Sequence, residues 1–112
     1  MDPAESREAT LRVLQETIVR MTSVEWELAL RSMPPELAEQ AKEERRRVNV
    51  ARTTLENAQL AAIRDQLVQN DEDLALGRQT VADALRDLQQ VKAVLDAVSS
   101  FVSVVGRIVT LV

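Results

Sequence analysis

Apolar residues recur with a strict seven-residue period through the last third of the chain. Counted from Leu74, the first position of every heptad is leucine or valine, and the fourth is alanine or valine except at Gly77. A repeat sustained this long is typical of an α-helix that packs along its length against a supercoiled partner. The pattern therefore predicts a helix over residues 73–112, with an apolar face that widens toward the C-terminus.

The N-terminal third carries a helix-start signal followed by a helical stripe. Asp2 can cap the first turn, Pro3 suits the first helical position, and Glu5 completes a capping-box-like pattern. A second capping pattern, which begins at Thr22, predicts a bend near that residue in a helix over residues 3–33. The apolar stripe of this helix consists of Leu11, Leu14, Ile18, Met21 and Leu28.

Two adjacent prolines, Pro34 and Pro35, separate the first helix from the second. The residue before a proline disfavours the α conformation, and Pro35 suits the first turn of a new helix. Strong helix formers without glycine or proline then predict a helix over residues 36–70. The polar run at residues 70–73 favours a turn, although a continuous helix through it is also compatible with the sequence.

These segments predict an all-α protein with one helical domain over residues 1–112. Its architecture is expected to be an elongated helical hairpin or a three-helix bundle with coiled-coil-like packing. In a hairpin the widened C-terminal face would lie beside residues 37–50, which are densely charged and poor in large apolar side chains. The first helix could supply the missing cover through its apolar side chains. If it does not, part of that face remains uncovered within one chain, which a stable monomer rarely tolerates.

An uncovered apolar face predicts an interface. We expect the chain to be a scaffold or protein-interaction module that forms a homo-oligomer or binds a partner helix through this heptad seam. The β-branched composition of the last residues would also suit a strand, but their register with the heptads favours a helix. The predicted interface residues are Leu88, Val91, Leu95, Val98, Phe101, Val102, Val105, Ile108 and Val109.

The composition gives little support to an enzymatic function. The chain has no histidine and no cysteine, which removes the commonest general base, the thiol nucleophile and most transition-metal ligands. No phosphate-binding or dinucleotide-binding motif is present, so we expect neither catalysis nor a cofactor. The net charge of −4 argues against a nucleic-acid partner, since such binding rests on neutralising phosphates.

One basic cluster stands out in the stretch EERRRVNVAR. Arg45, Arg46 and Arg52 could dock an acidic partner protein, or they could pair with glutamates one helical turn away on a solvated helix. Trp26 is the single tryptophan and has two similar alternatives, because it could anchor its helix in the bundle or act as a binding hot spot.

A membrane-active function is the alternative hypothesis. Residues 97–112 carry one charge, Arg107, but are shorter than the roughly 18–20 residues that span a bilayer. The chain could then be a secreted assembly subunit of the needle, translocator or pore-forming type, with its C-terminal helix in contact with lipid. Its charged beginning does not resemble a secretion signal, so a cytoplasmic location is the default and secretion without a signal stays open.

Overall fold

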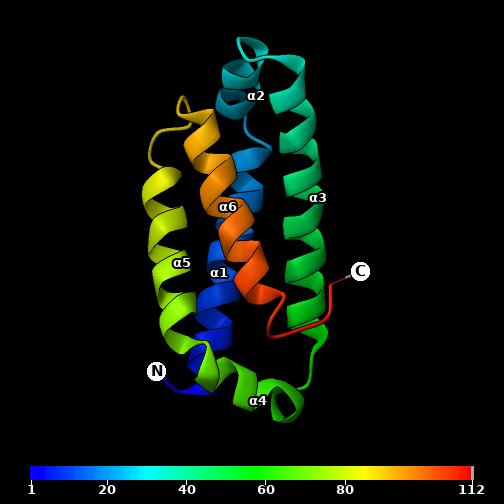
Figure 1. Cartoon of the computed structure of the whole chain (residues 1–112), viewed down its shortest axis with the longest axis vertical. Helices are drawn as coiled ribbons and strands as arrows, with labels where there is room; N and C mark the ends of the chain where they lie inside the picture. Colours follow the sequence, from blue (N-terminus) through cyan, green and yellow to red (C-terminus); the bar gives the residue numbers. More distant parts are fainter. Residues whose placement is uncertain (112) are drawn as a thin grey trace.

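Four helices lie side by side along the long axis of the molecule, and two shorter helices cross its ends (Figure 1). The computed structural model describes residues 1–111, and the molecule measures 44 × 25 × 18 Å along its principal axes. The described residues contain no strand. Their helices are α1 (Pro3–Met21), α2 (Val24–Arg31), α3 (Pro35–Asn57), α4 (Leu60–Gln69), α5 (Asp71–Ala84) and α6 (Val91–Val105).

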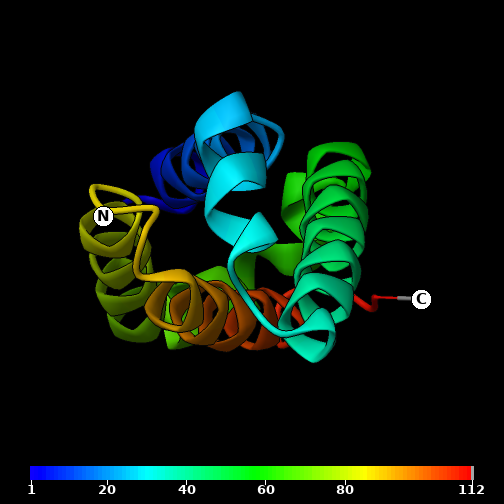
Figure 2. The same cartoon turned by 90° about the horizontal axis from the view of Figure 1, so that it is seen from above.

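The four longer helices form a ring around the core when they are viewed along the long axis (Figure 2). α1 packs against α3 and α5, and α6 packs against the same two helices from the opposite side of the ring. α2 lies at the end where α1 leads into α3, and α4 lies at the other end, where α3 leads into α5. The all-α prediction is confirmed, whereas the helical hairpin and the three-helix bundle are wrong.

The predicted architecture is wrong because each of the three long segments contains more than one helix. The first segment breaks after Met21, close to the predicted bend, and the second breaks after Asn57. The third contains α5 and α6, which are separated by residues 85–90. Between α4 and α5 the chain turns at Asn70, whose side-chain amide donates to the carbonyl of Gln66 at 2.9 Å.

The break after Asn57 has no glycine or proline to mark it in the sequence. Ala58 leaves the helix in an extended conformation, with φ −72° and ψ 139°. Its carbonyl oxygen accepts a hydrogen bond from the guanidinium of Arg7, on α1, at 2.9 Å. Because the last carbonyls of a helix lack intrahelical partners, a cation from another helix stabilises this end. A contact over 51 residues of sequence thus stabilises the break.

The chain reverses direction in the middle of the heptad repeat. Residues 85–90 reverse the chain, helped by a hydrogen bond from the Gln89 amide to the Asp87 carboxylate at 3.1 Å. α5 and α6 therefore run in opposite directions and pack directly against each other. Leu74 and Val81, the heptad residues of α5, are buried in the same core as the apolar side of α6. The seven-residue repeat marks the buried side correctly, but the continuous helix over residues 73–112 is wrong.

Residues 106–108 form a turn rather than a continuation of the helix. α6 ends at Val105, and the amide of Ile108 donates to the carbonyl of Val105 at 2.9 Å. Ile108 and Val109 still reach the core from this turn. Val112, the last residue of the predicted helix, lies outside the described residues. Within residues 1–111, each helix is too short or too polar to cross a bilayer.

The inward side of α1 is more polar than predicted. Leu11 and Ile18, from the predicted stripe, are half-buried at its margins, and Leu28 is exposed on α2. The Thr17 hydroxyl donates to the carbonyl of Val13 at 2.8 Å, which satisfies its hydrogen-bonding capacity in the interior. Small side chains suit a helix that contacts α3, α4 and α5 together. The buried residues of α1 are Ser6, Thr10, Leu14, Thr17 and Met21.

A partly buried arginine of α5, Arg78, approaches this polar side of α1. Its guanidinium donates to the Thr10 hydroxyl at 3.4 Å. Burial lowers the pKa of Arg78, and the nearby carboxylate of Asp71 acts in the opposite direction. The buried threonine therefore contributes an acceptor to a side chain that is partly removed from water.

Candidate functional site

The predicted C-terminal interface lies inside the folded chain. None of its side chains is more than 8% exposed, because α3 and α5 flank α6 and α1 closes the ring opposite to it. Of the two alternatives that the sequence left open, cover of this face within one chain is therefore the one observed. The buried residues are Leu88, Val91, Leu95, Val98, Phe101, Val102, Val105, Ile108 and Val109.

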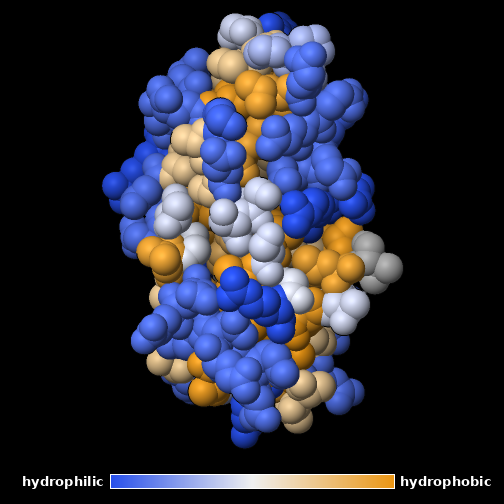
Figure 3. Space-filling model, in the orientation of Figure 1, coloured by the Kyte–Doolittle hydropathy of each residue, from blue (hydrophilic) through white to orange (hydrophobic). Residues whose placement is uncertain are grey.

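The outer side of α6 offers no apolar seam in its place. α6 exposes Lys92, Asp96, Ser100 and Ser103 to solvent. Hydrophilic residues predominate on the surface of this side of the molecule, with a central region of intermediate hydropathy and separate hydrophobic patches around it (Figure 3). A partner that approached α6 from outside would thus meet polar side chains.

The three predicted docking arginines do not form one site. Arg46 binds the carboxylate of Glu43 through two hydrogen bonds, of 2.7 and 3.1 Å, and Arg52 pairs with Glu56 at 3.0 Å. The hydrogen bond from Arg46 lowers the pKa of Glu43, and the same bond raises the pKa of Arg46. Successive helical residues point about 100° apart, so Arg45 faces a different surface from Arg46.

Arg45 lines a groove between α2 and the first half of α3. The groove has a volume of about 330 Å³ and reaches the end of α1. Its floor is apolar and consists of Met21, Trp26, Leu30, Ala38 and Ala41. Its rim consists of Glu27, Arg31, Lys42 and Arg45. We call this surface the basic groove.

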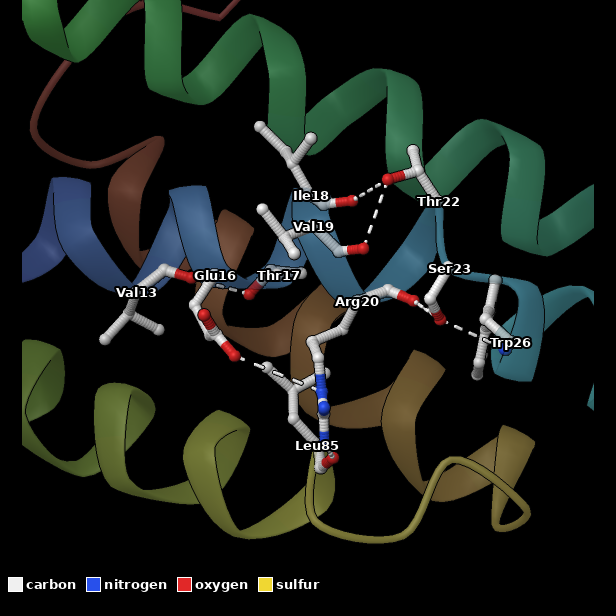
Figure 4. Close-up of polar contacts among 10 residues, drawn as sticks. All are labelled: Val13, Glu16, Thr17, Ile18, Val19, Arg20, Thr22, Ser23, Trp26 and Leu85. Carbon is white, nitrogen blue, oxygen red and sulfur yellow. Dashed lines mark hydrogen bonds and ion pairs between the residues drawn. The ribbon is translucent and has the colours of Figure 1, made fainter.

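The sharp turn between α1 and α2 places Trp26 in the floor of the basic groove (Figure 4). The Ser23 hydroxyl donates to the carbonyl of Arg20 at 2.7 Å and accepts the amide of Trp26 at 3.2 Å. This residue therefore ends one helix and caps the next. The Thr22 hydroxyl adds hydrogen bonds to the carbonyls of Ile18 and Val19, at 2.9 and 3.1 Å.

Trp26 serves mainly as an anchor of α2. Its side chain is 2% exposed, so most of the indole packs into the core and only an edge contributes to the floor. The binding hot spot proposed from the sequence is thus restricted to that edge. A ligand that enters the groove meets Leu30 and the alanines of α3 beside the indole.

A long-range hydrogen bond holds the turn against the rest of the bundle. Arg20 reaches across from α1 and donates to the carbonyl of Leu85, just after α5, at 2.8 Å. Glu16 lies 4.0 Å from the Arg20 Nε. Arg20 thus joins the end of α1, next to the basic groove, to the loop between α5 and α6 (Figure 4).

Replacing Arg20 with methionine should lower the free energy of unfolding by about 1–2 kcal/mol, because the charge-assisted hydrogen bond to Leu85 is lost while the apolar stem remains. Urea unfolding followed by circular dichroism measures the change. Arg12→Met is the matched control, since Arg12 lies on the same helix and is exposed. Equal stability of the two variants would contradict a structural contribution of the Arg20 contact.

The rim of the basic groove is electropositive. Lys42 pairs only loosely with Glu39, at 3.8 Å, and both side chains are largely exposed. Within residues 1–111, neither Arg31 nor Arg45 forms an ion pair. Glu27 is the single acidic side chain of the rim. A negatively charged ligand therefore finds cationic groups that are not already neutralised.

Other grooves of the molecule carry a different balance of charge. The groove between α1 and α3 is lined by charges of both signs, among them Glu16, Arg52 and Glu56, with Leu11 as its apolar member. Residues 1–111 contain no group of three acidic side chains placed to hold a metal ion. The basic groove thus combines an apolar floor with three cationic side chains and a single acidic one.

The sequence contained part of the signal for this site. Arg45 and Lys42 lie three residues apart on a predicted helix, so a common face was foreseeable. The contributions of Leu30 and Arg31 were not foreseeable, because they depend on how α2 packs against α3.

Comparisons of the chain with protein-family models, with curated proteins and with solved structures found no match.

Proposed function

We propose that this chain is a non-enzymatic protein-interaction module that binds an acidic, amphipathic segment of a partner protein in the basic groove. The observation that carries this proposal is the apolar floor beneath three cationic side chains, Arg31, Lys42 and Arg45. An apolar side chain of the partner would displace water from the floor, and neighbouring carboxylates would pair with the rim.

The size of the basic groove limits what it can hold. A volume of about 330 Å³ lies at the lower end of the range for ligand pockets, and it accommodates one or two apolar side chains. The cationic rim adds attraction at longer range, which raises the association rate and weakens as salt is added. We therefore expect a modest, salt-dependent affinity for a short segment.

The heptad seam is a less accessible binding surface for a partner than the basic groove. The sequence suggested that the seam forms a homo-oligomer or receives a partner helix, but its side chains are packed within the chain. Binding there would require α6 to leave the ring and expose its buried side. The basic groove needs no such rearrangement, because its rim and the half-buried floor residues Leu30 and Ala38 are reachable in the folded chain.

Selection of helix-forming peptides from a displayed library, with the full chain as bait, tests the proposal. We expect the selected peptides to combine glutamate or aspartate with a large apolar residue. Replacing Arg31, Lys42 and Arg45 with glutamine should weaken their binding about tenfold. Each exposed ion pair contributes roughly 0.2–1 kcal/mol, and about 1.4 kcal/mol corresponds to a factor of ten. Calorimetric titration of the best peptide measures the change.

The matched control removes the same number of positive charges elsewhere. Arg12, Arg86 and Lys92 are exposed and lie outside the basic groove, so their replacement with glutamine should leave peptide binding close to that of the original chain. Equal losses in both triple variants would contradict a localised site. Binding to anionic phospholipid vesicles that requires the rim, without binding to any peptide, would favour the membrane-active alternative instead.

A further inference from the structure

The end of the molecule opposite to α2 carries an exposed surface with the complementary chemistry. Val68, near the end of α4, is 60% exposed, and Leu76, in the first half of α5, is 68% exposed. Asp65 lies one turn before Val68, and Glu72 lies one turn before Leu76, so each apolar side chain shares a helix face with a carboxylate. We call these four residues the acidic corner.

The carboxylates of the acidic corner are available to a partner. Asp65 and Glu72 are exposed and form no ion pair among residues 1–111. Their neighbours are already engaged, since Asp73 binds Arg107 at 2.7 Å and Asp71 lies 3.7 Å from the N-terminal amine. Arg64 is also exposed and unpaired among residues 1–111, and it lies one turn before Val68. The acidic corner thus offers large apolar side chains beside two carboxylates and one guanidinium, so its net charge is negative.

We infer that a second copy of this chain occupies the basic groove, with the acidic corner of one copy docked on the α2–α3 end of the next. This inference rests on the proposed function of the basic groove and identifies its occupant. Three features support it: the net charges of the two surfaces are opposite in sign, each surface has an apolar part, and the two surfaces lie toward opposite ends of the long axis.

The geometry has a consequence for the assembly. A groove that binds a different surface of an identical chain makes a head-to-tail contact, which leaves one free groove and one free corner after every addition. Copies therefore continue to add unless the rotation between neighbours closes a ring. Because the two surfaces are small, we expect weak association that grows with concentration, without a fixed size.

Sedimentation velocity of the full chain over a range of concentrations tests this inference. One variant carries Arg31→Gln, Lys42→Gln and Arg45→Gln in the basic groove. A second carries Val68→Ser, Glu72→Gln and Leu76→Ser in the acidic corner, where exposure of these side chains favours retention of the fold. Circular dichroism of each variant confirms that it is folded. Each variant alone should stay monomeric at concentrations where the original chain forms larger species.

The decisive experiment is to mix the two variants. The first variant retains its acidic corner and the second retains its basic groove, so an equimolar mixture should form a one-to-one dimer that does not grow. A monomeric original chain that still binds acidic peptides would overturn the self-association and leave the proposed function standing. Loss of both activities would overturn both proposals. Continued association of either variant alone, or loss of association in the Arg12→Gln, Arg86→Gln, Lys92→Gln control, would also overturn the head-to-tail contact.

Discussion

Replacing Val98 with aspartate should unfold most of the chain. Val98 is 1% exposed on the inward side of α6, and an unpaired carboxylate there has no polar partner to replace water. Such substitutions cost about 4–5 kcal/mol or more, which is comparable to the roughly 5–15 kcal/mol that stabilises a typical domain. Circular dichroism and urea unfolding of the purified variant measure the loss of helix and of stability.

The matched control for this substitution is Ser100→Asp. Ser100 lies two residues away on the same helix and is exposed, so the variant should retain its fold and nearly all of its stability. The comparison also distinguishes a core from an interface. If the heptad seam were an interface between separately folded copies, Val98→Asp would yield a folded monomer, and that result would contradict the burial of α6 described above.

The second large effect is expected at the contact between Phe101 and Gly77. The ring of Phe101 packs over Gly77, and a methyl group added at Gly77 would lie 2.6 Å from the Phe101 Cδ1. Gly77→Ala should therefore lower the free energy of unfolding by about 1–3 kcal/mol, the usual cost of overpacking. Phe101→Ala should cost about 3–5 kcal/mol, because it leaves a cavity between α5 and α6.

The double variant gives the sharpest test of this contact. Once Phe101 is replaced with alanine, the clash disappears, and Gly77→Ala should become stabilising by up to about 1 kcal/mol through its higher helix propensity. The sign of the Gly77→Ala effect should thus reverse between the two backgrounds, as measured by urea unfolding. A Gly77→Ala effect of the same sign and size in both backgrounds would show that the two residues do not touch.

Local signals in the sequence predicted several features of the helices. Asp2 caps α1 through hydrogen bonds from the amides of Ala4 and Glu5, and Pro35 opens α3, as their residue types suggested. The predicted bend near residue 22 corresponds to the turn between α1 and α2. These features depend on a few neighbouring residues, so tertiary contacts are not needed to foresee them.

The candidate site was predicted only in part. Arg45 belongs to the basic groove, but Arg46 and Arg52 pair with glutamates of their own helix. Periodicity alone could not separate them, since it describes which residues share a face and not which face meets a neighbour. The partners of Arg45 in the groove come from α2, whose path is set by the turn at Ser23 and by packing of Trp26.

The sequence by itself determined that the chain is all-α and which side of its last third avoids water. The spacing of apolar residues carries this information because it follows from the geometry of a helix, which depends only on residues close together in sequence. Only the tertiary structure decided that this side is covered by the same chain. Reversal at residues 85–90 brings α5 back along α6, and contacts such as Arg7 with Ala58 and Arg20 with Leu85 stabilise the places where helices end. Those contacts join residues far apart in sequence, so no local sequence pattern predicts them.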